Sequence, residues 1–112
     1  MSIPHPLSDE LAVLIARRFR AMSEPGRIKL LDRLRDGEAT VNELSAATGM
    51  SQQGTSKHLT LLAEAGILAR RREANRVYYR IADEGVLALC EDVCGSIERQ
   101  LAALNELVAA RR

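Results

Sequence analysis

Aromatic residues are scarce in this chain, which has one Phe, two Tyr and no Trp among its 112 residues. Proteins that hold single-stranded nucleic acid stack successive bases on aromatic side chains. Three rings are too few for such a platform. The composition therefore disfavours single-stranded nucleic acid as a partner.

Motifs of catalysis are missing as well. The sequence contains no Gly-rich phosphate loop, no nucleophile elbow and no evident pair of catalytic carboxylates. Its two cysteines, Cys90 and Cys94, have three residues between them, whereas the C-x-x-C redox motif has two. We therefore expect that the protein is not an enzyme.

Long apolar runs are also absent. No stretch approaches the roughly 18 apolar residues that a membrane-spanning helix needs. The first ten residues, MSIPHPLSDE, lack the basic start and apolar core of a signal peptide. We expect a cytoplasmic protein with no membrane partner, in which the cysteines are normally reduced.

The overall composition is that of a soluble globular domain, with 46% hydrophobic and 28% charged residues. We expect one domain that covers residues 1–112. A chain of this length buries about two-thirds of its surface on folding, so its core is small. Small helical domains of this kind often gain further stability by forming dimers.

Positive charge is concentrated in one third of the chain. The net charge is only +1, but residues 51–80 contain six basic and two acidic residues. A basic block is most often only a solvated face. Its position at the end of a helix-turn-helix pattern in residues 40–66 favours contact with nucleic acid.

Start and stop signals divide the first part of the chain into four helices. Ser8 and Ser51 are good N-caps, and Thr40 with Glu43 fits a capping box. Pro25 is suited to the first turn of a helix. The segment 40–66 then contains two short helices around Gly49, the pattern of a helix-turn-helix. The four helices are expected over residues 8–22, 25–36, 40–49 and 51–66.

The hydrophobic period changes to that of a strand after Gly66. ILARRRE (67–73) and RVYYRI (76–81) are short runs separated by two residues, which predicts a β-hairpin over 67–82. Asn75 is expected to take the left-handed conformation of the turn. Tyr78 and Tyr79 point to opposite faces, so one of them belongs to the core.

The last segment, 83–110, predicts a long helix with a regular apolar seam. Seven residues along it are spaced alternately by three and four positions, which favours association with another helix over burial in a small core. Helix 8–22 carries further apolar surface, and we expect these two helices to form a homodimer interface. The seam consists of Leu87, Cys90, Cys94, Ile97, Leu101, Leu104 and Val108.

These elements make a mainly α fold with a small β-hairpin, in the order of a winged helix-turn-helix with an added helix at each end. The sequence strongly resembles the ArsR/SmtB family of bacterial transcriptional repressors. The likeness is carried by SEPGRIKLLDRL (23–34), TVNELSAATGMSQQGTSKHLTLLAEAGIL (40–68) and RRREANRVYYRI (70–81).

The resemblance implies a homodimeric, sequence-specific repressor that binds an inverted repeat in double-stranded DNA. It makes 51–58 the groove-facing start of the recognition helix, in which four residues are candidates for base contacts. Lys57 and His58 would meet phosphate, although His58 could equally pack within the domain. The predicted DNA-binding residues are Ser51, Gln52, Gln53, Thr55, Ser56, Lys57 and His58, with Arg70, Arg72 and Arg76 on the wing.

Members of the family usually lose DNA affinity after binding a metal ion or after thiol chemistry. The family's Cys-Val-Cys-Asp-Leu metal motif corresponds here to 40–44, which has no cysteine, and the final helix has no His. Only Cys90 and Cys94 remain as an effector site. They could bind a thiophilic metal or metalloid ion, act as a redox switch, or merely pack as small apolar groups. The alternative is a winged helix without a sensor, acting as a constitutive DNA-binding or protein-interaction module.

Overall fold

The computed structural model describes residues 3–111 and contains five helices and three short strands among them. This confirms the predicted mainly α fold with a small sheet, and the helix bounds agree closely with those expected from the caps. The elements are α1 (Asp9–Ala21), α2 (Pro25–Leu34), β1 (Ala39–Thr40), α3 (Val41–Thr48), α4 (Gln52–Glu64), β2 (Leu68–Glu73), β3 (Arg76–Ile81) and α5 (Gly85–Ala110).

Helix starts follow the caps in the sequence. The Ser8 side chain accepts a hydrogen bond from the Leu11 amide, 3.2 Å away. Thr40 and Glu43 form a complete capping box at the start of α3. These side chains satisfy backbone N–H groups that have no partner within the first turn, which is why α1 and α3 begin where they do.

The sheet has the strand order β1-β3-β2, with both pairings antiparallel. The strand β1 was not predicted, because two residues carry no recognisable period. The predicted turn geometry was wrong in one respect. Ala74, with φ of 55°, takes the left-handed conformation, and Asn75 does not. Glu73 pairs with Arg76, so Ala74 is the first of two turn residues and must follow the twist of the hairpin.

The core lies between α2, α3, α4 and the inner face of the sheet. Tyr79 is 3% exposed, so it is the tyrosine that the alternation placed inside. Leucines from three helices meet it, and the start of α5 adds Val86. The side chains buried most completely are Leu30, Leu31, Leu44, Leu59, Leu62, Ile67 and Thr55.

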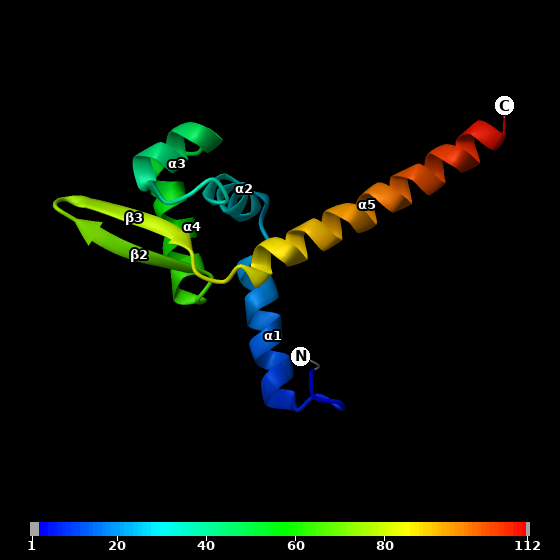
Figure 1. The fold of residues 1–112 in the computed structure, drawn as a ribbon, viewed down its shortest axis with the longest axis horizontal. Coiled ribbons are helices and arrows are strands. Elements are labelled where there is room, and N and C mark those ends of the chain that lie inside the picture. The colour runs from blue at the N-terminus through cyan, green and yellow to red at the C-terminus, as the bar shows by residue number, and fades with distance from the viewer. Residues whose placement is uncertain (1–2, 112) are drawn as a thin grey trace.

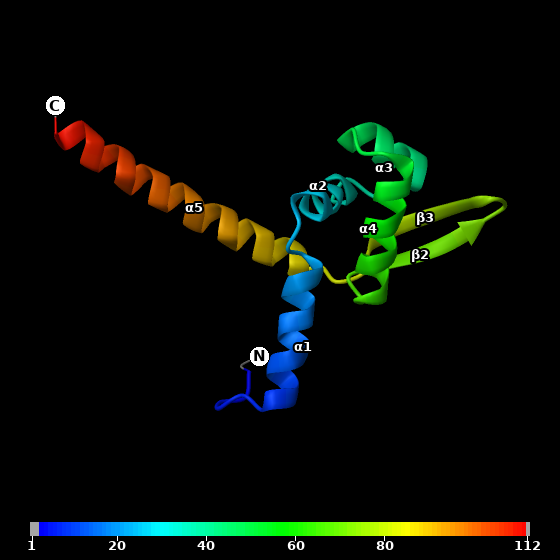
Figure 2. The same ribbon diagram turned by 180° about the vertical axis from the view of Figure 1, so that it is seen from behind.

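Two helices extend away from this core (Figures 1 and 2). The protomer measures 61 × 40 × 22 Å, and its radius of gyration is 17.5 Å, whereas a compact domain of this length has about 13 Å. Apolar side chains on both projecting helices are exposed, for example Phe19 at 53% and Leu101 at 55%. Further exposed apolar residues on α5 are Val93, Ile97, Leu104, Leu107 and Val108.

Two ion pairs hold α5 against the rest of the domain. Arg18 of α1 bonds Asp83, just before α5, and Arg35 donates a 3.0 Å hydrogen bond to Glu91. Among the residues that the structure describes, no helix combines the length and the apolar character needed to cross a membrane.

Candidate nucleic-acid interface

The turn between α3 and α4 is fixed by local hydrogen bonds. Gly49, with φ of 75°, ends α3 and donates its amide to the Ser45 carbonyl. The Ser45 hydroxyl donates to the Met50 carbonyl at 2.6 Å. Ser51 then caps α4 by accepting from the Gly54 amide at 3.0 Å. The angle between the two helices is therefore set by backbone geometry and by two serines.

The polar side of α4 faces outward at its N-terminal end. We call its exposed residues Gln52, Gln53, Ser56 and Lys57 the recognition face. The Gln52 amide nitrogen donates to the Asn42 side-chain oxygen at 2.6 Å, so Asn42 of α3 orients the first residue of this face. Asn42 had not been singled out in the sequence, because nothing there indicates this contact between the two helices.

Thr55 does not belong to the recognition face. Its side chain is 0% exposed, and its hydroxyl has no hydrogen-bond partner among the residues described. The prediction that Thr55 contacts bases was wrong. Thr55 lies four and seven positions before Leu59 and Leu62, which places it on the inward side of the helix.

His58 also points into the domain. Its Nδ1 lies 3.3 Å from the Arg27 guanidinium, and its Nε2 lies 3.9 Å from a Glu24 carboxylate oxygen. The imidazole is 21% exposed. These contacts agree with the alternative that His58 packs within the domain, since both ring nitrogens face groups of the domain itself.

The arginines of the wing separate onto two faces. Residues directly opposite each other in an antiparallel pair share a face. Arg70 pairs with Tyr79 and Arg72 with Val77, so both arginines lie on the face that turns toward α4. Arg71 pairs with Tyr78 on the other face, where it bonds Glu38 and Glu73. The hydrogen bonds that Arg71 donates to Glu38 lower the pKa of that carboxyl group.

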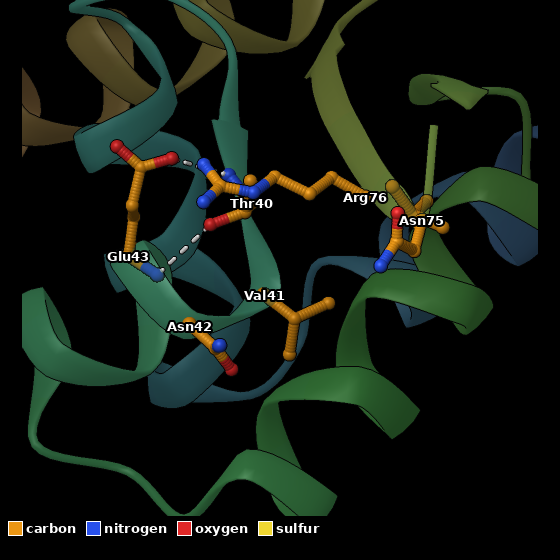
Figure 3. Close-up of a pocket in the computed structure, with 7 residues that line it drawn as sticks. Thr40, Val41, Asn42, Glu43, Asn75 and Arg76 are labelled. Atoms are coloured by element: carbon orange, nitrogen blue, oxygen red, sulfur yellow. Dashed lines mark hydrogen bonds between the residues drawn. The ribbon is translucent and has the colours of Figure 1, made fainter. Parts of the chain in front are cut away.

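Arg76 reaches from the wing over the first turn of α3, as Figure 3 shows. It lines a hollow of about 390 Å³ together with Thr40, Asn42 and Glu43. Hydrogen bonds from Thr40 are the main cause that lowers the pKa of Glu43, and the charges of Arg33 and Arg76 add to the effect. In this structure the charge of Arg76 therefore acts on a nearby carboxylate, whereas Arg72 forms no ion pair within residues 3–111.

Together these groups provide what binding to duplex DNA requires. The N-terminus of α4 and the Ser51 hydroxyl suit a phosphate, and the glutamines of the recognition face can bond base edges in a major groove that admits one helix. Arg70 and Arg72 are exposed on the inner face of the wing, Arg70 next to α4, and within the described chain neither is in an ion pair. The fold and this surface define a winged helix-turn-helix protein that binds DNA.

A second feature lies far from this interface. Cys90 and Cys94 line a groove of about 500 Å³ between α2 and α5, along with Ile28, Leu31 and Leu87. Burial raises the pKa of the Cys90 thiol, and Cys94 is exposed near Glu98. Within residues 3–111, no three His, Cys, Asp or Glu side chains are grouped to hold a metal ion.

Known proteins resemble this chain in sequence and in fold. A profile of the family described as bacterial regulatory protein, arsR family, matches residues 24–70. The biofilm growth-associated repressor of Agrobacterium fabrum is 36% identical over 89 residues, which cover 80% of this chain and 76% of that protein.

Two solved structures extend the similarity to three dimensions. One is the homodimeric winged helix-turn-helix DNA-binding domain of a possible ArsR-family regulator from Mycobacterium bovis, with a TM-score of 0.75, 34% identity and coverage of 90% and 94% of the two chains. The other is the antimony-specific repressor AntR, with a TM-score of 0.78, 31% identity and coverage of 91% and 93%. The chain belongs to the arsR family of bacterial regulatory proteins, and it is a DNA-binding transcriptional regulator.

Proposed function

We propose that the protein is a homodimeric repressor that binds an inverted repeat, with its two recognition helices in successive major grooves. The observation that carries this proposal is the separation of two surfaces on one protomer. The polar recognition face and the wing arginines lie on the DNA-binding unit, whereas the exposed apolar residues lie on α1 and α5. A two-fold dimer through the apolar helices would present two copies of the recognition face to one side of the duplex.

The structure supports a revised assignment of DNA contacts. Gln52, Gln53 and Ser56 are the residues that we propose for base edges, since their side chains are exposed on α4. Phosphate contacts fall to Ser51, Lys57 and the wing arginines Arg70, Arg72 and Arg76. Thr55 and His58 are left out because their side chains face the interior. A regulator with such contacts works in the cytoplasm, where a bacterial chromosome is found.

Selection of DNA from a random pool tests this function directly. The purified protein is incubated with random duplexes, and bound DNA is recovered over several rounds. We expect an inverted repeat whose half-site centres lie about one helical turn, or a multiple of it, apart. Arg72→Ala and Gln53→Ala should both weaken binding. If no sequence is enriched, or if both variants bind like the unchanged protein, the fold acts through protein contacts instead.

Release from DNA by an effector at Cys90 and Cys94 is a separate part of the proposal. Both thiols line one groove between α2 and α5, so a change there would reach the dimer helix and the DNA-binding unit together. Similarity to an antimony-specific repressor supports testing antimonite first. One protomer supplies two thiolates, and metalloids or zinc prefer three or four ligands, so a metal site would need both subunits.

The second candidate is a regulator in which these cysteines only pack. The raised pKa of Cys90 favours it, because a thiol is a weak ligand and a weak nucleophile until it loses its proton. The test compares the DNA affinity of the reduced protein and of Cys90→Ser/Cys94→Ser, with and without antimonite, cadmium, zinc or a persulfide. A sensor loses affinity with one addition only when its cysteines are present. Unchanged affinity throughout supports the regulator without a sensor.

A further inference from the structure

One buried arginine occupies a position of α2 where an apolar residue would be expected. Arg27 precedes Leu30, Leu31 and Leu34 at helical spacing on the core side, and it is only 7% exposed. Its Nε donates to the Ala21 carbonyl at 2.6 Å, and one terminal nitrogen donates to the Arg20 carbonyl at 3.3 Å. The guanidinium therefore bonds the last turn of α1, where it adds to the hydrogen bonds that Ser23 donates to the Arg20 carbonyl.

The same guanidinium contacts the recognition helix. Its other terminal nitrogen lies 3.3 Å from Nδ1 of His58, in the middle of α4. Arginine only donates hydrogen bonds, so a hydrogen bond here requires Nδ1 as the acceptor. Nε2 faces Glu24, the residue before α2, at 3.9 Å, and Glu24 also lies 3.7 Å from Arg27. Arg27 and His58 thus connect α1, α2 and α4.

Glycine at the start of α2 allows this close approach. A Cβ atom added to Gly26 would lie 3.0 Å from the Met50 sulfur and 3.2 Å from Nε2 of His58. Both distances are shorter than ordinary van der Waals contact. The backbone of α2 therefore lies against the recognition helix at His58 and against the turn that precedes this helix at Met50. This packing is independent of the hydrogen bonds of Arg27, and it leads to the same contact.

We propose that Arg27 and His58 are positioning residues that fix the recognition helix relative to α1, and that they thereby set the half-site spacing which the dimer accepts. Neither residue reaches DNA. The inference rests on the proposed homodimer, in which α1 is part of the interface. In such a dimer, the angle between α1 and α4 in each subunit decides how far apart, and at what rotation, the two recognition faces lie.

Half-site spacing is sensitive to that angle. Inserting one base pair rotates one half-site by about 35° around the duplex, since a turn contains 10–10.5 base pairs. A dimer with rigidly held recognition helices binds tightly to only one half-site spacing. When α4 is released from α1, it can follow the rotated half-site, so selectivity for spacing falls while contacts to each half-site persist.

The experiment measures affinity for a series of duplexes that carry the selected half-site as an inverted repeat, with spacers shorter or longer by one base pair. A duplex with a single half-site is included. His58→Leu keeps the bulk of the side chain and removes the acceptor. His58→Asn retains an oxygen near the position of Nδ1. Thr60→Ala, exposed on the same helix, is the matched control. Circular dichroism checks that each variant is folded.

Unchanged protein and Thr60→Ala should lose about tenfold affinity or more with each altered spacer, comparable to a wrong base pair. For His58→Leu that loss should shrink to about twofold or less, with single half-site affinity nearly unchanged, and His58→Asn should restore selectivity. Gly26→Ala should act like His58→Leu, because it moves the ring. If His58→Leu keeps the full spacing profile, the inference is overturned while the repressor function stands. If the unchanged protein binds no inverted repeat, both this inference and the proposed repressor function are overturned.

Discussion

The guanidinium carbon of Arg71 lies 4.4 Å from the centre of the Tyr78 ring, directly across the wing. The same guanidinium bonds Glu38 and Glu73, so its charge is already paired with two carboxylates and one ring face. Its neighbours Arg70 and Arg72 point to the opposite face and have no such partners within residues 3–111. Adjacent arginines in one strand therefore have different roles.

Substitution of these neighbours should separate DNA binding from wing structure. In Arg72→Ala, the logarithmic dependence of affinity on salt should flatten by about 0.9 for each phosphate that is no longer neutralised, hence by nearly two in a homodimer. Arg71→Ala is the matched control and should leave that slope unchanged. Titration of the selected duplex at several salt concentrations measures both. A slope that falls equally in the two variants would contradict the division of the wing into two faces.

Thr55→Val should stabilise the protein. The Thr55 hydroxyl is buried and lacks a hydrogen-bond partner in the described chain, and such a group costs about 1–3 kcal/mol. Valine has nearly the same shape without the hydroxyl. We expect the free energy of unfolding in urea to rise by roughly 1 kcal/mol, with DNA affinity unchanged. Ser56→Ala, at its exposed neighbour, should leave the free energy of unfolding unchanged and lower the affinity for DNA. Reduced DNA affinity of Thr55→Val would show that the hydroxyl acts at the interface.

Polar substitutions in the distal part of α5 should dissociate the dimer. Leu101 and Leu104 are 55% and 57% exposed in the protomer. Burial of a leucine side chain contributes about 1.5–3 kcal/mol. Leu101→Glu/Leu104→Glu should therefore weaken association at least about a hundredfold. Sedimentation equilibrium should then give the 12.3 kDa mass of one chain. Gln100→Glu is the control, and a double variant that stays dimeric would exclude this seam as the interface.

Alkylation of Cys90 should continue to accelerate above the pH at which an ordinary cysteine reaches its plateau. Burial raises the pKa of this thiol. At a pH near about 8.5, the pKa of an ordinary cysteine, Cys90 therefore contains less thiolate than an ordinary cysteine does. The rate of reaction with iodoacetamide, measured against pH in Cys94→Ser, reports the pKa. The same measurement on Cys90→Ser gives the pH profile of Cys94 for comparison. A plateau for Cys90 below pH 8.5 would show that the thiol is activated, as a redox sensor requires.

Local sequence signals predicted most of the fold. Ser8, Thr40 and Ser51 cap their helices by accepting a hydrogen bond from the backbone amide three residues later, so the signal is local in the sequence. The errors arose where the type of a residue does not match the position that it occupies in the structure. Thr55 is polar but falls in line with Leu59, and Ala74 takes a left-handed turn position that alanine rarely adopts.

Contacts between distant segments were the part of the site that the sequence could not supply. Arg27 and His58 are 31 residues apart, and no periodic pattern joins them. One signal was present: Arg27 lies at a core-facing position of α2, where a buried charge needs partners. The identity of those partners follows only from the packing of α2 against α4.

The affinity of the dimer for its selected inverted repeat, measured across salt concentration, tests DNA binding most directly. If the dimer neutralises 6–10 phosphates, affinity should fall roughly 10³–10⁵-fold between 50 and 200 mM salt. The complex should contain two chains for each duplex. Affinity that hardly varies with salt, or one chain for each duplex, would contradict a homodimeric regulator that reads DNA with α4 and the wing.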